Sequence, residues 1–168
     1  EKIVRYANGI YFIPKPSQFI TQTISIEQII NRKYLLDEVN EEVIGYKTGI
    51  QFANQMRLTT QTASVFNIVT NIETNAKRKK ELNDWTIILR KPVVPVNKSN
   101  QKLLQVLDLL KNYNEISELP LLECTNRLKE YLSDVKISQK EYEQIIMKYP
   151  KKTIILAYES GLKNEVTS

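Results

Sequence analysis

The strongest constraint on the fold is a change of sequence pattern near residue 97. Before it, short runs of β-branched and aromatic residues alternate with short helical patterns; after it, apolar residues recur only at helical spacing. Strands close enough for hairpins, followed by helices, predict an α+β fold with antiparallel strands in its central part and a helical C-terminal part, rather than a doubly wound parallel sheet. The expected strands are 43–46, 65–70 and 85–91, and the expected later helices are 99–111, 121–133 and 138–149, with a last helix from Pro150 to about Gly161.

Helix starts are indicated by three capping-box patterns, in which Ser or Thr is followed three positions later by Gln or Glu. They begin at Ser25, Thr48 and Ser138. The first predicts a helix to about residue 34, and the second predicts a helix to about residue 56.

The chain opens with a hairpin signal. Asn8-Gly9 lies between the β-prone runs 2–6 and 10–13, and both residues of the pair tolerate the positive φ of a tight hairpin turn. Pro14 then ends strand pairing. Because a two-stranded hairpin is marginal alone, we expect it to pack on the body of the chain or to belong to a longer N-terminal unit.

Composition limits the chemistry. The sequence has no histidine, one cysteine (Cys124) and four glycines, which excludes histidine bases and ligands, cysteine-rich zinc sites and glycine-rich phosphate loops. We therefore expect a protein that is not an enzyme and uses no cofactor. The single cysteine and the lack of a run of about 20 apolar residues favour a cytoplasmic protein without a membrane span.

Acidic residues leave two alternatives open. An acidic loop could hold a divalent cation through carboxylate oxygens, although it lacks the spacing of an EF-hand. Glu73 and Asp84 flank a basic segment, and acids combined with lysines occur in metal-dependent nucleases. The acidic loop consists of Asp37, Glu38, Glu41 and Glu42.

The basic segment Lys77-Arg78-Lys79-Lys80 has two interpretations. If all four side chains reached phosphates, the binding constant would fall with salt with a logarithmic slope of roughly −3 to −4. Alternatively, the segment is a solvated edge strand whose charges prevent aggregation. The net charge of +5 and pI of 9.2 fit a polyanionic partner and equally fit an AT-rich genome.

The opening hairpin resembles a known wing. Its Arg5, Gly9, Ile10, Tyr11 and Pro14 match the Arg-x-x-x-Gly-Ile/Val-Tyr pattern, ending in proline, that closes the N-terminal winged helix of AbiEi-family type IV antitoxins. Segment 48–61, with Leu58-Thr59-Thr60-Gln61, resembles that family's helix followed by Leu-Ser/Thr-Thr-Gln. Segment 66–71 resembles its next strand, and the basic stretch together with 85–90 resembles its following hairpin, so the resemblance covers about residues 3–110.

This resemblance implies a non-catalytic antitoxin and transcriptional autoregulator of a bacterial toxin–antitoxin, or abortive-infection, module. Its partners would be operator DNA, bound by the winged helix of the intact protein, and a nucleotidyltransferase toxin, neutralised directly or functionally. A protein-interaction module of an unrelated bacterial system is the alternative. The expected DNA-binding residues are Arg5, Asn8, Lys15, Lys77, Arg78, Lys79 and Lys80.

The same interpretation divides the chain into four segments. We expect it to begin inside the winged-helix domain. The segments are the wing hairpin 1–16, an α+β antitoxin-like domain 17–96, a helical extension 97–163 packed on it, and a frayed tail 164–168.

Overall fold

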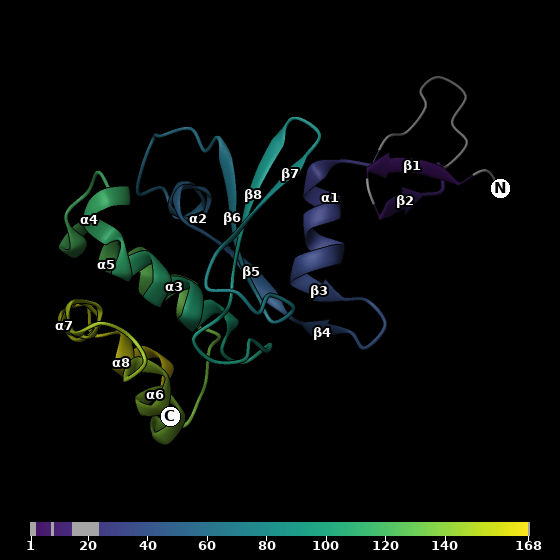
Figure 1. Ribbon diagram of the computed structural model, residues 1–168. Helices are drawn as coiled ribbons and strands as arrows, with labels where there is room; N and C mark the ends of the chain where they lie inside the picture. The colour runs from purple at the N-terminus through teal and green to yellow at the C-terminus, as the bar shows by residue number, and fades with distance from the viewer. Residues whose placement is uncertain (1–2, 8, 15–23, 168) are drawn as a thin grey trace.

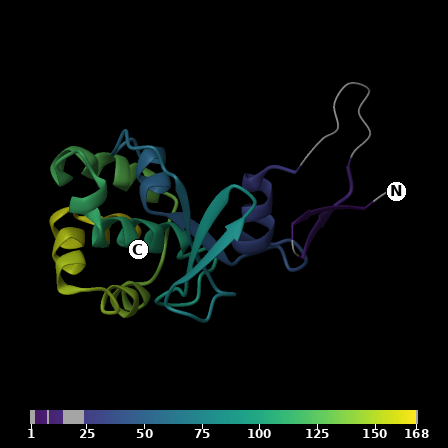
Figure 2. The ribbon, with the colours of Figure 1, turned by 45° about the horizontal axis from the view of Figure 1, so that its top comes forward.

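The computed structural model describes residues 3–7, 9–14 and 24–167. Along the chain, an antiparallel hairpin is followed by a mixed sheet with helices on both faces and then by a group of helices (Figure 1). The hairpin and the helical group lie at opposite ends of the molecule, with the sheet between them (Figure 2). The fold is α+β, as predicted.

The described strands form three sheets. The hairpin pairs β1 (Val4–Ala7) with β2 (Ile10–Phe12), and a second antiparallel pair joins β3 (Leu36–Asp37) to β4 (Glu42–Val43). The four-stranded sheet has the order β5-β6-β8-β7. Its strands are β5 (Gly45–Thr48), β6 (Val65–Thr70), β7 (Arg78–Leu82) and β8 (Trp85–Arg90).

One pairing departs from the antiparallel sheet expected for this region. The strands β6 and β8 run parallel, while β5–β6 and β7–β8 are antiparallel. After β6 the chain skips one strand position to form β7, and the tight turn at Asn83 then brings β8 back into the space between them. Insertion of β8 places β7, with its basic residues, at the edge of the sheet.

The helices fall into two groups. The first group flanks the sheet, and the second forms the C-terminal part of the chain (Figure 1). The first comprises α1 (Ile26–Ile30), which continues as the π-helical turn η1 (Asn31–Leu35), and α2 (Ile50–Gln55). The second comprises α3 (Gln101–Lys111), α4 (Tyr113–Ile116), α5 (Leu121–Leu132), α6 (Gln139–Ile146), α7 (Lys151–Glu159) and α8 (Leu162–Val166).

The alternation of side chains along β6 divides the core between the two faces of the sheet. Ile68 points to the face covered by α1 and η1, in a cluster with Ile30 and Tyr34. Val69 points to the other face, in a cluster that runs from Tyr46 through the buried leucines of α3 into α5, α6, α7 and α8. The helical part therefore packs on the sheet and shares one continuous hydrophobic core with it.

The capping patterns have different outcomes. Ser25 forms the complete reciprocal box with Gln28, with hydrogen bonds of 3.1 and 2.9 Å, and Ser138 caps α6 through its side chain. The box at Thr48 is wrong because Thr48 is the last residue of β5. Gly49, at φ +70°, is the N-cap of α2 and makes no side-chain cap.

The expected frayed tail is also wrong for the residues that the structure describes. Gly161, at φ +64°, ends α7 as predicted, but the chain then forms α8. Val166 is fully buried, and its carbonyl accepts a hydrogen bond from the backbone N–H of Ile137 at 3.0 Å. Leu162 and Val166, both fully buried, hold this last helix against α5.

Within the described residues, every helix is too short or too polar to cross a membrane.

Candidate nucleic-acid interface

The basic segment forms most of the edge strand β7, with Lys77 just before it. Side chains along a strand point alternately to the two faces, so Arg78 and Lys80 lie on one face and Lys79 on the other. Arg78 and Lys79 are exposed, and Lys80 is half-buried. The basic segment therefore lies on a solvent-exposed edge strand. Its four side chains do not form a single surface that could contact one line of phosphates.

Arg78 is held by a buried acid. Its Nη2 lies 2.9 Å from Oε1 of Glu73, whose side chain is only 2% exposed. The same oxygen accepts backbone N–H groups of Thr74 and Asn75, each at 2.9 Å. Desolvation, the largest single effect, raises the pKa of Glu73, but the hydrogen bonds and the charge of Arg78 outweigh it, so this pKa lies below its usual value. The Arg78–Glu73 pair mainly fixes the loop that leads into β7.

Lys79 also has its own acid. Its Nζ lies 2.6 Å from Glu81, which accepts a second hydrogen bond from the hydroxyl of Thr86 at 2.7 Å. Both charged side chains are more than half exposed, so this ion pair contributes little to stability. It does reduce the local positive charge on this face of β7.

Lys80 differs from its neighbours because it lies near another lysine. Its Nζ is 6.0 Å from the ring centroid of Tyr34, and Nζ of Lys33, on η1, is 5.9 Å from the same centroid. Burial, followed by the charge of Lys80, lowers the pKa of Lys33. Among the residues that the structure describes, no carboxylate forms an ion pair with either lysine.

The two lysines border a cavity of about 400 Å³ between the hairpin, η1 and the β7–β8 hairpin. Ala7 and Ile10 of the opening hairpin form one wall. Leu82 and Ile87 add further apolar surface, and the exposed Asn83 lies at the turn. The sheet thus brings the end of the basic strand next to the predicted wing.

The predicted wing is an antiparallel hairpin, with Arg5 opposite Tyr11 and Gly9 at φ +71° in the turn. Arg5 is exposed, on the same face as Tyr11, which is 59% exposed. Asn8 and Lys15, the other two residues of this segment that were predicted to bind DNA, lie outside the described residues.

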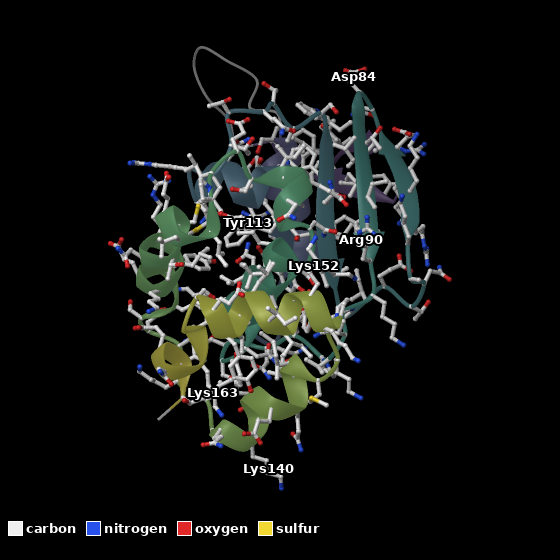
Figure 3. All side chains as sticks on the ribbon, turned by 90° about the vertical axis from the view of Figure 1, so that its left-hand side faces the viewer. Asp84, Arg90, Tyr113, Lys140, Lys152 and Lys163 are labelled. Carbon is white, nitrogen blue, oxygen red and sulfur yellow. The ribbon has the colours of Figure 1, made fainter. Side chains whose placement is uncertain are left out.

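The alternative acidic sites do not come together. Glu73 contacts the first residue of β7, whereas Asp84 lies in the turn beyond its last residue, at the tip of the β7–β8 hairpin (Figure 3). A five-residue strand separates them by roughly 16 Å. In the acidic loop, Asp37 accepts hydrogen bonds from Val39 and Asn40 of its own turn. The described part of the chain contains no group of three or more potential metal-ligating acids, cysteines or histidines.

A buried polar link joins the sheet to α3. The hydroxyl of Tyr46 donates to Oδ2 of Asp108 at 2.7 Å. Burial raises the pKa of Asp108, against the opposing effects of this hydrogen bond and of the charges of Lys111 and Arg90. Asp108 is absent from the sites predicted from sequence, and its contacts indicate a role in orienting α3 on β5.

Lys33 is the main residue of this surface that sequence reasoning missed. It stands in a helical pattern with polar neighbours, and nothing local distinguishes it from a solvated lysine. Only the packing of η1 against the sheet brings it to Lys80.

Comparison of the chain with protein-family models, with curated proteins and with solved structures finds no match.

Proposed function

We propose that this chain is part of a non-catalytic antitoxin and transcriptional autoregulator of a bacterial toxin–antitoxin module. In this proposal the opening hairpin is the wing of a winged-helix domain that binds operator DNA, and the cognate toxin is a nucleotidyltransferase. The sequence motifs of the hairpin and of segments 48–61 and 66–71 support the family, because they occur in the family's order.

The observation that carries the DNA-binding part is the position of the hairpin. An exposed Arg5 stands on a hairpin whose inner residues border the same cavity as Lys33 and Lys80. A wing contacts the DNA backbone, and phosphate contacts position a protein without specifying sequence. Lys33 and Lys80 form no ion pair with an acid among the described residues, and their positive charge next to the wing extends such a contact from the hairpin onto the body of the protein.

Segment 48–61 supports the antitoxin part through its hydrogen bonds to the helical part of the chain. Its motif residues Thr59 and Thr60 are bound by one carboxylate, Glu118, which accepts the Thr59 hydroxyl at 2.8 Å and the Thr60 backbone N–H at 3.1 Å. Glu118 precedes α5, so the family-like segment and the helical part form one framework. That framework could present a fixed surface to a partner.

A second function, protein recognition through the helical part, is favoured by the outer face of α7. Ile155 and Tyr158 lie one helical turn apart and are each 55% exposed. Aromatic and aliphatic side chains of this kind are typical anchors of protein interfaces. In the proposed system this surface would serve direct contact with the toxin.

The test uses the intact protein expressed beside the nucleotidyltransferase encoded next to it. Relief of growth arrest by the intact protein, and repression of a reporter driven by the operon's own promoter, are the expected results. Growth arrest that persists at full antitoxin expression would reject the antitoxin function, and an unrepressed reporter would reject autoregulation. The variant Ile155→Glu then separates direct from indirect neutralisation, because it should weaken only a direct contact.

A further inference from the structure

We propose that Lys33 and Lys80 form a phosphate-binding site in the cavity between the opening hairpin, η1 and β7. The inference rests on the proposed function where the phosphate belongs to DNA, and stands independently of it where the phosphate belongs to a free nucleotide. Its ligand is a phosphate group that carries an organic substituent.

Lys33 and Lys80 bring two positive charges to one side of the sheet. Two ammonium groups lie within about 6 Å of the centroid of the same ring, that of Tyr34, and both side chains are half-buried. After burial, the charge of Lys80 is the second cause that lowers the pKa of Lys33, so the two ammonium groups repel each other, and such repulsion is stronger where water is partly excluded. A phosphate oxyanion between them would neutralise both charges and replace the repulsion by charge-assisted hydrogen bonds.

The basic residues next to Lys80 are already paired with acids. Arg78 is paired with Glu73 at 2.9 Å, and Lys79 with Glu81 at 2.6 Å. Glu81 also borders the cavity, but its carboxylate is already engaged by Lys79 and by the Thr86 hydroxyl. The basic segment therefore supplies only Lys80 to this cavity, and the second cation comes from a different element, η1.

The size and lining of the cavity favour a ligand larger than a phosphate ion. The cavity of about 400 Å³ exceeds what a bare phosphate ion needs, and Ile10, Leu82 and Ile87 provide apolar walls. Asn83 adds an amide at the turn, next to the lysines, that can donate a hydrogen bond. A cationic pair beside an apolar wall suits a phosphate bonded to a sugar, either in a nucleotide or in a nucleic-acid backbone.

The experiment is an NMR titration of the full chain in a phosphate-free buffer at low salt, first with inorganic phosphate and then with thymidine monophosphate. We expect saturable shifts of the signals around Lys33 and Lys80, with tighter binding of the nucleotide. Lys33→Gln and Lys80→Gln should each weaken binding about tenfold, the effect of one lost charge-assisted hydrogen bond. Lys140→Gln is the matched control, because Lys140 is an exposed lysine on α6, in the helical part of the chain (Figure 3), and its loss should leave binding unchanged.

Absence of saturable binding to either ligand would overturn the inference. An equal loss of binding in the Lys140 variant would also overturn it, because it would show that the ligand is attracted by the overall charge and not by this site. A second arm titrates a short DNA duplex. Loss of duplex binding in the Lys33 and Lys80 variants assigns the site to backbone phosphate. If these variants lose nucleotide binding but keep duplex binding, the site binds free nucleotides and the cavity does not contact DNA. Duplex binding that persists in variants while neither small ligand binds the wild type would refute the site and leave DNA binding by the wing intact.

Discussion

Truncation of Leu107 tests whether the sheet and the helical part are a single folding unit. Leu107 is fully buried on α3, in the cluster that connects Tyr46 of β5 with the C-terminal helices. Leu107→Ala removes apolar surface and leaves a cavity, at a cost of about 3 kcal/mol in the free energy of unfolding. With a urea dependence of about 2 kcal/mol per molar, the unfolding midpoint should fall by about 1.5 M.

Two probes report on the two parts of the molecule in the same urea titration. The fluorescence of Trp85, the only tryptophan, follows the sheet, where its ring packs on Phe66 at 5.3 Å between centroids. Far-ultraviolet circular dichroism follows mainly the helices. Because one cluster joins sheet and helices, both transitions should move together by the same amount.

A shift of the dichroism transition while the Trp85 transition stays in place would refute this reasoning, because it would show that the helical part unfolds alone. Leu122→Ala is the control. Leu122 is 86% exposed on α5, so its truncation should change the midpoint by less than about 0.3 M, equivalent to roughly 0.5 kcal/mol.

Three further perturbations test the local account. Gly45→Ala should lower the free energy of unfolding, measured by urea denaturation, by about 3 kcal/mol, because the alanine Cβ would overlap the backbone carbonyl oxygen of Tyr34. Unchanged stability would contradict that close packing. Glu73→Gln should cost about 2 kcal/mol at neutral pH through the lost charge-assisted bonds to Arg78 and the loop. The pKa of Glu73 is lower in the folded protein than in the unfolded chain, where it is about 4.3. Its stabilisation of the fold is therefore present above a pH of about 4.3 and is lost as the pH falls through the pKa of the folded state. In acid denaturation curves, the difference in the free energy of unfolding between the variant and the wild type should shrink accordingly. Ser25→Ala should cost about 1 kcal/mol by removing the cap of α1, and a neutral result would refute its role.

Sequence predicted those parts of the fold that depend on neighbouring residues. The strand expected at 65–70 matches β6, and the strand expected at 85–91 matches β8. The Ser25 cap also formed as expected. Each of these features is encoded within a few residues, so local propensity determines it.

Features that depend on distant contacts were not predictable in the same way. The parallel pairing of β6 with β8 depends on which strand occupies the space beside β6, and no local signal contains that information. Thr48 belongs to β5 because its partner across the ladder is Asn67, and this pairing overrides a capping pattern that is valid in isolation. The C-terminal turn is ordered because Val166 reaches the core.

The candidate site shows the same division. The basic segment was visible in the sequence, but the acids that engage Arg78 and Lys79, and the lysine that approaches Lys80, became identifiable only from the fold. Glu73 was interpreted as a possible catalytic acid, and it instead lies buried against Arg78. Charge in the sequence therefore overestimated the number of cations available to a ligand.

The most direct test of the account is the salt dependence of duplex DNA binding by the full chain, measured by fluorescence anisotropy. Contacts from Arg5, Lys33 and Lys80 to separate or shared phosphates predict a slope of log K against log salt of about −2 to −3. The double variant Lys33→Gln/Lys80→Gln should bind more weakly, with a slope closer to about −1. Absence of binding by the wild type at low salt, or a slope that the double variant leaves unchanged, would contradict the claim that the hairpin and this lysine pair form one nucleic-acid surface.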